Sequence, residues 1–153
     1  MRRAFCVFIG ASLIGCAVAT REDRITRDMS DEVARSERGA FESHTRARLA
    51  ALERSLNDFI RAEGRIPASL DELVPQYLAE IPEVELGVAG HKDTSAVVYY
   101  DQDVISDGQV NGALLRDSGG WGYVFSDRQV VVFIDCTHKR MDGEFWYKAR
   151  GVY

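Results

Sequence analysis

The segment from Arg46 to Pro82 constrains the fold of this chain more than any other part of the sequence. Its apolar residues recur at steps of three and four, a spacing that places them on one face of a helix. The residues on this face, which we predict to form part of the core, are Leu49, Leu52, Leu56, Phe59 and Ile60. Charged residues lie on the opposite face, so the sequence predicts an amphipathic helix with one buried side.

The residues after this helix indicate where it ends and where a second one begins. Gly64 readily adopts the left-handed conformation that often closes a helix, and Pro67 prevents an immediate restart. From Ser69 to Glu72 the chain reads Ser-x-x-Glu, in which the serine caps a backbone N–H and the glutamate reaches back. We therefore expect a short second helix here.

Apolar runs in the C-terminal half predict the strands that pack against the long helix. They are rich in β-branched and aromatic residues, a composition that suits a pleated, half-buried surface. The runs are Ala96–Tyr100, Trp121–Phe125 and Gln129–Asp135, and we expect a last strand at Glu144–Lys148. Trp121 is a further predicted core residue. The expected fold is of the α+β class, with a long amphipathic helix packed on a small antiparallel sheet.

This order of features resembles the globular head of type II secretion major pseudopilins and type IV pilins. The resemblance covers Leu49–Pro82 and resumes at the glycine-aromatic run Gly119–Tyr123. It implies a helical spine on a small sheet, and a role in assembly rather than catalysis. A prepilin also carries about twenty apolar residues that form its polymerising stalk. Here Arg21–Arg38 is strongly charged instead, so the chain departs from the family at this point.

The charged segment precedes the amphipathic helix and has few apolar residues. Ile25, Met29 and Val33 follow a loose helical rhythm in it. We expect residues 16–40 to form a charged tether or a projecting helix, and residues 41–153 to form the pilin-like domain. One helix then runs from about Asp31 to Glu63, and its first half projects.

The first residues have the pattern of an export signal. Arg2 and Arg3 precede an apolar run of the length expected for a secretory signal, so residues 1–15 are predicted to be removed. Residues 13–16 resemble a lipobox, which predicts acylation of Cys16 and anchoring at the periplasmic face of a bacterial membrane. The alternative is a cut after Ala19, which leaves a soluble periplasmic protein.

Charge excludes one class of partner. The formal net charge is −5, and removing the leader with Arg2 and Arg3 lowers it to −7 because every acidic residue lies after position 20. An acidic surface repels phosphate groups, so we expect no nucleic-acid binding.

An acidic loop between the first two predicted strands is the first candidate ion site. Carboxylates suit calcium, and the resemblance implies calcium in a comparable loop. The candidate ligands are Asp101, Asp103, Asp107 and Asp117. Their spacing is not that of an EF-hand, so solvated turn carboxylates are the competing interpretation, and no other cofactor is expected.

Cys136 and His138 form the second candidate site, because alternate residues of a strand share a face. We interpret Cys136 as a small buried hydrophobe rather than a nucleophile or zinc ligand, since His44 and His91 show no ligand spacing. With Cys6 and Cys16 in the leader or its cleavage site, no structural disulfide is expected.

Three functions remain open at this point. The first is a non-enzymatic exported protein that serves a type II secretion or pilus-like envelope assembly and binds its proteins. The second is a periplasmic module that binds a small ligand or calcium. The third is a thiol enzyme using Cys136 and His138.

Overall fold

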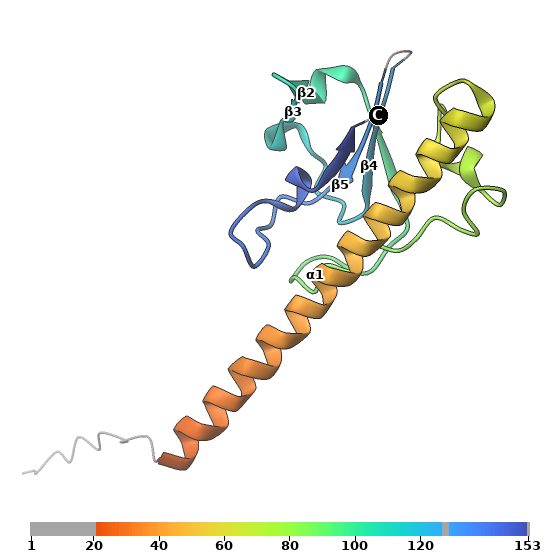
Figure 1. Ribbon diagram of the computed structural model, residues 1–153. Coiled ribbons are helices and arrows are strands. Elements are labelled where there is room, and N and C mark those ends of the chain that lie inside the picture. Colours follow the sequence, from red (N-terminus) through yellow and green to blue (C-terminus); the bar gives the residue numbers. More distant parts are fainter. Residues whose placement is uncertain (1–20, 127–128, 153) are drawn as a thin grey trace, which may run out of the picture.

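The computed structural model describes residues 21–126 and 129–152 and confirms the α+β class. Figure 1 shows one long helix, α1 (Arg21–Glu63), whose C-terminal half lies against a small sheet, while its N-terminal half extends away from the rest of the molecule. The protein therefore has a head and a projecting helix.

Helix α1 begins ten residues earlier than the sequence predicted. The segment from Arg21 to Arg38 has no glycine or proline, and Glu22 and Asp23 lie in the first turn, where negative charge favours a helix. The helix ends where predicted, because Gly64 has φ +66° and its N–H donates to the Ile60 carbonyl at 3.0 Å.

The projecting part of α1 makes no buried contact. Its described side chains are exposed from Glu22 to Arg38, and contact with the head begins at Gly39. At 1.5 Å per residue, this part is about 27 Å long. The predicted boundary at residue 40 falls inside the continuous helix, at the point where it meets the head.

A four-stranded sheet forms the centre of the head. Its strands are β1 (Val97–Tyr100), β4 (Trp121–Phe125), β5 (Val130–Ile134) and β6 (Arg150–Val152), in the spatial order β1-β4-β5-β6. The consecutive strands β4 and β5 are antiparallel neighbours and form a hairpin. β6 is antiparallel to β5.

The sheet is mixed rather than wholly antiparallel as predicted. β1 and β4 are parallel, with Val97 opposite Trp121. The reason is the connection between them, which returns from the end of β1 to the start of β4 through residues 101–120, and parallel neighbours require such a crossover. This connection contains two 3-10 helices and a short hairpin, namely η2 (Gln102–Val104), β2 (Ile105–Ser106), β3 (Gln109–Val110) and η3 (Gly112–Leu114).

The prediction of a last strand at Glu144–Lys148 is wrong. Trp146–Lys148 forms the 3-10 helix η4, and β6 follows it. The chain first makes a tight turn in which the Arg140 N–H donates to the Glu144 carbonyl at 2.7 Å, and Trp146 is buried beside it. The chain therefore reaches the edge of β5 only after residue 149.

The short helix predicted from Ser69 forms as a single 3-10 turn, η1 (Leu70–Leu73). Glu72 Oε1 accepts hydrogen bonds from the N–H groups of Ala68 at 2.6 Å and Ser69 at 3.3 Å, as the Ser-x-x-Glu motif predicted. Leu70 and Leu73 are fully buried, so this turn covers one end of the core.

Two apolar clusters lie on the two faces of the sheet. On one face, the stripe of α1 packs with residues of β4 and β5 and with η1. Of the predicted core, Leu49, Leu52, Leu56, Phe59 and Trp121 are buried, and Ile60 is half-buried. On the other face, residues of the β1–β4 connection cover the sheet, including Val104, Val110 and the half-buried Leu115. The head thus has three layers, with the sheet in the middle.

Polar contacts hold the long segment between α1 and β1 in place. The Trp121 indole N–H donates to the Pro82 carbonyl at 2.7 Å, and the Tyr123 hydroxyl donates to the Pro67 carbonyl at 2.5 Å. Thr45 of α1 donates to the Glu85 carbonyl at 2.5 Å and accepts from the Glu85 N–H at 3.0 Å. An isolated bridge between Val84 and Thr94 then closes the loop that carries His91.

Candidate metal centre

Four side chains of metal-ligating type converge at one end of the sheet. They are His91, Asp117, Cys136 and His138, and their ligand atoms all lie within 4.8 Å of one another. His91 Nε2 is 3.2 Å from His138 Nδ1 and 3.4 Å from Asp117 Oδ1. Cys136 Sγ is 3.5 Å from His138 Nδ1. Among residues 21–126 and 129–152, this is the one group of three or more such residues that could hold a metal ion.

Three separate segments supply these side chains. Cys136 and His138 follow the end of β5, Asp117 precedes the start of β4, and His91 comes from the loop closed by the Val84–Thr94 bridge. Because β4 and β5 are antiparallel, the start of one lies beside the end of the other. The sheet topology therefore brings Asp117 next to Cys136, and the loop adds His91.

A fully buried carboxylate, that of Asp135, shapes the loop on which Asp117 lies. Its Oδ1 accepts from the Tyr100 hydroxyl at 2.8 Å and from the Asp117 N–H at 3.3 Å. Its Oδ2 accepts from the Ser118 N–H at 3.1 Å and the Ser118 hydroxyl at 2.6 Å. Buried carboxylates are tolerated where such donors surround them, so Asp135 fixes the backbone beside the candidate ligands.

Gly119 allows the His91 ring to approach. A Cβ added at this glycine, which has φ +78°, would lie 2.6 Å from His91 Nδ1. No side chain fits in that space without moving the imidazole. Gly119 thus makes room for a candidate ligand.

The protonation properties of the cluster reflect burial and mutual proximity. Burial raises the pKa of the Cys136 thiol to about 12. Burial also acts to raise the pKa of Asp117, but hydrogen bonding with Thr137 and the positive potential of His91 and His138 outweigh it, so the net shift is downward. The Thr137 N–H donates to Asp117 Oδ1 at 2.7 Å. Asp117 is therefore held as an anion that faces two imidazoles.

Sequence reasoning missed this group. His91 shows no ligand spacing in the sequence because 47 residues separate it from His138, and only the fold brings the two rings together. The spacing of Cys136 and His138 was the one local signal. The other predicted residues lie elsewhere: His44 Nδ1 is 3.8 Å from Glu85 Oε2.

The predicted calcium ligands do not come together as a set. Asp101 and Asp103 lie at η2, and Asp107 has φ +51° in the turn between β2 and β3. Asp117, by contrast, belongs to the cluster with His91. In the described part of the chain, the acidic loop therefore offers no group of three carboxylates for calcium. Cys16, the predicted lipidation site, lies outside the described residues.

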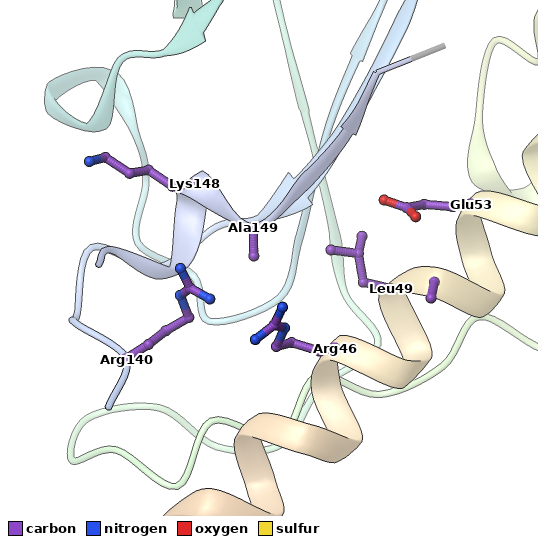
Figure 2. A pocket seen from close by; sticks show the side chains of 7 residues that line it. Arg46, Leu49, Glu53, Arg140, Lys148 and Ala149 are labelled. Carbon is purple, nitrogen blue, oxygen red and sulfur yellow. The ribbon is translucent and has the colours of Figure 1, made fainter. Parts of the chain in front are cut away.

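A groove between α1 and the C-terminal segment is shown in Figure 2, with the side chains of Arg46 and Arg140 facing each other. Its volume is about 370 Å³, and its remaining lining residues are Leu49, Ala50, Glu53, Lys148 and Ala149. Carboxylates already accompany its cations, because Glu42 lies 3.9 Å from both arginines and Glu144 lies 2.6 Å from Lys148. The groove therefore has little excess charge with which to bind an ion.

Comparison of the chain with models of known families, with curated proteins and with solved structures finds no match. In the part of the chain that the structure describes, no helix has a stretch both long and apolar enough to cross a bilayer.

Proposed function

We propose that this protein is a non-enzymatic, exported component or accessory of a type II secretion or type IV pilus-like envelope assembly, anchored to the membrane through a lipid on Cys16. The signal-like first residues and the resemblance of Leu49–Pro82 to pseudopilin heads motivate this proposal. Its partners are then envelope proteins, and its place is the periplasmic face of a bacterial membrane.

The observation that carries the proposal is the shape of α1. One half of the helix is packed on the sheet, and the other half is a charged rod that contacts nothing else in the described chain (Figure 1). A helix that packs against nothing is only marginally stable in water, because most helices in proteins depend on packing of an apolar face. A rod that extends about 27 Å from its own domain suits contact with another protein.

The rod carries an apolar stripe for such a contact. Ile25, Met29 and Val33 recur at every fourth position, which places them on one side of the helix. Their exposed fractions are 50%, 65% and 57%. In a segment otherwise rich in charge, three exposed apolar side chains in a row favour a helical partner that packs along the stripe.

The other two functions have less support from the geometry. Cys136 is fully buried and burial raises its pKa to about 12, which leaves little thiolate for a nucleophile at neutral pH. The groove of Figure 2 is open to solvent and lacks the enclosed apolar surface that small-molecule sites present.

Crosslinking in the native envelope tests the proposal. The full chain with its own leader is expressed with a photocrosslinking residue in place of Glu32, on the rod, and captured proteins are identified by mass spectrometry. We expect components of a secretion or pilus assembly. The variant Ile25→Gln/Met29→Gln/Val33→Gln should lose them, because glutamine keeps the helix and removes the apolar stripe.

The matched control changes the opposite side of the rod without altering net charge. Arg27→Gln/Asp31→Asn should retain the captured components, and both variants should keep the melting temperature of the unaltered protein, since all five residues are exposed. Capture that is independent of the stripe, or capture of unrelated proteins alone, would contradict the proposal.

A further inference from the structure

We propose that His91, Asp117, Cys136 and His138 bind one Zn²⁺ ion in a tetrahedral site. The ligand atoms are His91 Nε2, Asp117 Oδ1, Cys136 Sγ and His138 Nδ1. This inference is independent of the proposed assembly role, because it rests on the head and not on the projecting helix.

Three of the six separations between these atoms are close to those of a tetrahedral zinc site, and all six are within 4.8 Å. Metal–nitrogen and metal–oxygen bonds of about 2.1 Å and a metal–sulfur bond of about 2.3 Å place neighbouring ligand atoms about 3.4 to 3.6 Å apart. The two imidazole nitrogens are 3.2 Å apart, His91 Nε2 and Asp117 Oδ1 are 3.4 Å apart, and the thiol sulfur is 3.5 Å from His138 Nδ1. The remaining pairs lie within 4.8 Å, so the ligand atoms need only draw together to place an ion among them.

The donor types also select zinc over calcium. Calcium takes six to eight oxygen atoms, whereas this site offers two imidazoles, one thiol and one carboxylate. Borderline-soft zinc accepts nitrogen, sulfur and oxygen ligands together. The charges balance as well, since a thiolate and a carboxylate neutralise the two positive charges of the ion at a partly buried site.

Binding requires that Cys136 lose its proton. The sulfur–hydrogen bond breaks, the proton passes to solvent, and the sulfur lone pair forms the bond to zinc, with no change in oxidation state. The positive charge of the ion drives this loss despite burial, because a coordinated thiol is deprotonated outright. Zinc affinity should therefore fall as pH decreases.

Four protein ligands leave no open position for substrate, so the site is structural rather than catalytic. The ion joins two parts of the head, namely the loop that carries His91 and the segments that flank β4 and β5. The sheet alone does not connect these two parts. Surrounding groups already orient the ligands: the Thr137 N–H donates to Asp117 Oδ1, and Asp135 holds the backbone of Asp117 and Ser118. Zinc then fixes a loop that covers one end of the head.

The first experiment measures metal content and geometry in the full chain. The protein is purified without chelator, dialysed against Zn²⁺ and analysed by mass spectrometry of the metal. We expect one zinc per chain and a rise in melting temperature that a chelator reverses. Replacement by Co²⁺ should give the intense visible bands of tetrahedral cobalt and a thiolate-to-cobalt charge-transfer band, whereas Ca²⁺ should leave the melting temperature unchanged.

Ligand variants then identify the site. His91→Gln, His138→Gln and Cys136→Ser should each weaken zinc binding by more than roughly tenfold, because even outer-shell changes have effects of that size. His44→Gln is the matched control, since His44 is 68% exposed on α1 and outside the cluster. It should bind zinc as tightly as the unaltered protein.

Folding and binding are separated by circular dichroism of each metal-free variant. His91 lies in a loop, so His91→Gln should keep the native spectrum even if Cys136→Ser does not. Zinc well below one per chain, an octahedral cobalt spectrum, or undiminished binding in a folded His91→Gln protein would each overturn the proposal.

Discussion

The hydroxyl of Tyr100 donates a hydrogen bond to Asp135 Oδ1 at 2.8 Å while it accepts one from the Arg116 N–H at 2.7 Å. Tyr100 ends β1, and Asp135 directly follows β5, so one phenol joins the edge strand to the loop that carries Asp117. The buried Asp135 carboxylate thus holds together the segments that meet at this end of the sheet.

We expect Asp135→Asn to destabilise the head. An amide nitrogen donates where the carboxylate accepts, so one or more of the donors on Tyr100, Asp117 and Ser118 would lose its partner. A hydrogen-bond partner lost in a buried site reduces the free energy of unfolding by about 1 to 3 kcal/mol. Urea unfolding of the metal-free protein measures this loss.

Asp103→Asn is the matched control, because Asp103 is exposed at η2. Its effect on the free energy of unfolding should stay within about 0.5 kcal/mol, as for most surface substitutions. Equal stability of the two variants would show that the Asp135 carboxylate does not hold the loop.

Leu56→Ala tests the packing of α1. Leu56 is fully buried between α1 and the sheet, so truncation leaves a cavity and should lower the free energy of unfolding by about 2 to 5 kcal/mol. Leu56→Asp should prevent folding altogether, since it buries an unpaired charge. Denaturant unfolding followed by tryptophan fluorescence is suitable, because Trp121 lies in the same cluster.

Val33→Ala provides the comparison on the same helix, since Val33 is 57% exposed. The change should leave the unfolding midpoint nearly unaltered. If Val33→Ala and Leu56→Ala had the same effect, the division of α1 into a packed half and a projecting half would be incorrect.

The helix and its buried face were predictable because both signals are local. Leucines at steps of three and four set the face, and Gly64 set the end. The earlier start of α1 was missed because the segment from Arg21 to Arg38 is strongly charged and its apolar stripe consists of only Ile25, Met29 and Val33. The segment forms a helix because it contains no glycine or proline, the two residues least favourable in a helix.

Neither the parallel pairing of β1 nor the convergence of the candidate metal ligands was predictable from local pattern. Both depend on the path of the β1–β4 connection, and composition does not show where a long loop returns. His91 and Asp117 meet only because that loop and the loop before β1 end at the same edge of the sheet. Cys136 is buried, as predicted. A buried thiol can nevertheless also be a metal ligand.

We expect Gly119→Ala to weaken zinc binding, in addition to the loss of stability that backbone strain causes. The added Cβ would lie 2.6 Å from His91 Nδ1, so the imidazole must move away from the other ligands. We expect at least roughly tenfold weaker zinc binding, measured by competition with a chromophoric chelator.

Gly90→Ala separates this effect from backbone strain. Gly90 also has positive φ, at +93°, but a Cβ there would meet nothing within 4 Å. Both variants should lose stability because alanine is strained at positive φ. Only Gly119→Ala should lose zinc, and equal affinities in the two variants would mean that the contact between Gly119 and His91 does not matter for binding.

Stability should decrease as the solution becomes strongly basic, because of the half-buried Tyr100 and the buried Tyr123. Burial raises the pKa of Tyr100 from 10.0 to about 12 and also raises the pKa of Tyr123. A group whose pKa is higher in the folded state binds more protons there, so its contribution is complete below pH 10 and is lost as pH rises toward 12. The free energy of unfolding of the metal-free protein should therefore fall above pH 10.

Tyr100→Phe isolates one tyrosine in this series. The variant lacks the hydroxyl, so it should be less stable at neutral pH but should lose stability less steeply above pH 10 than the unaltered protein. Cys136 and Tyr123 titrate in both proteins, which removes their contributions from the comparison. Parallel curves would mean that ionisation of Tyr100 is not coupled to folding, and the link from β1 to Asp135 would then add little to the stability of the head.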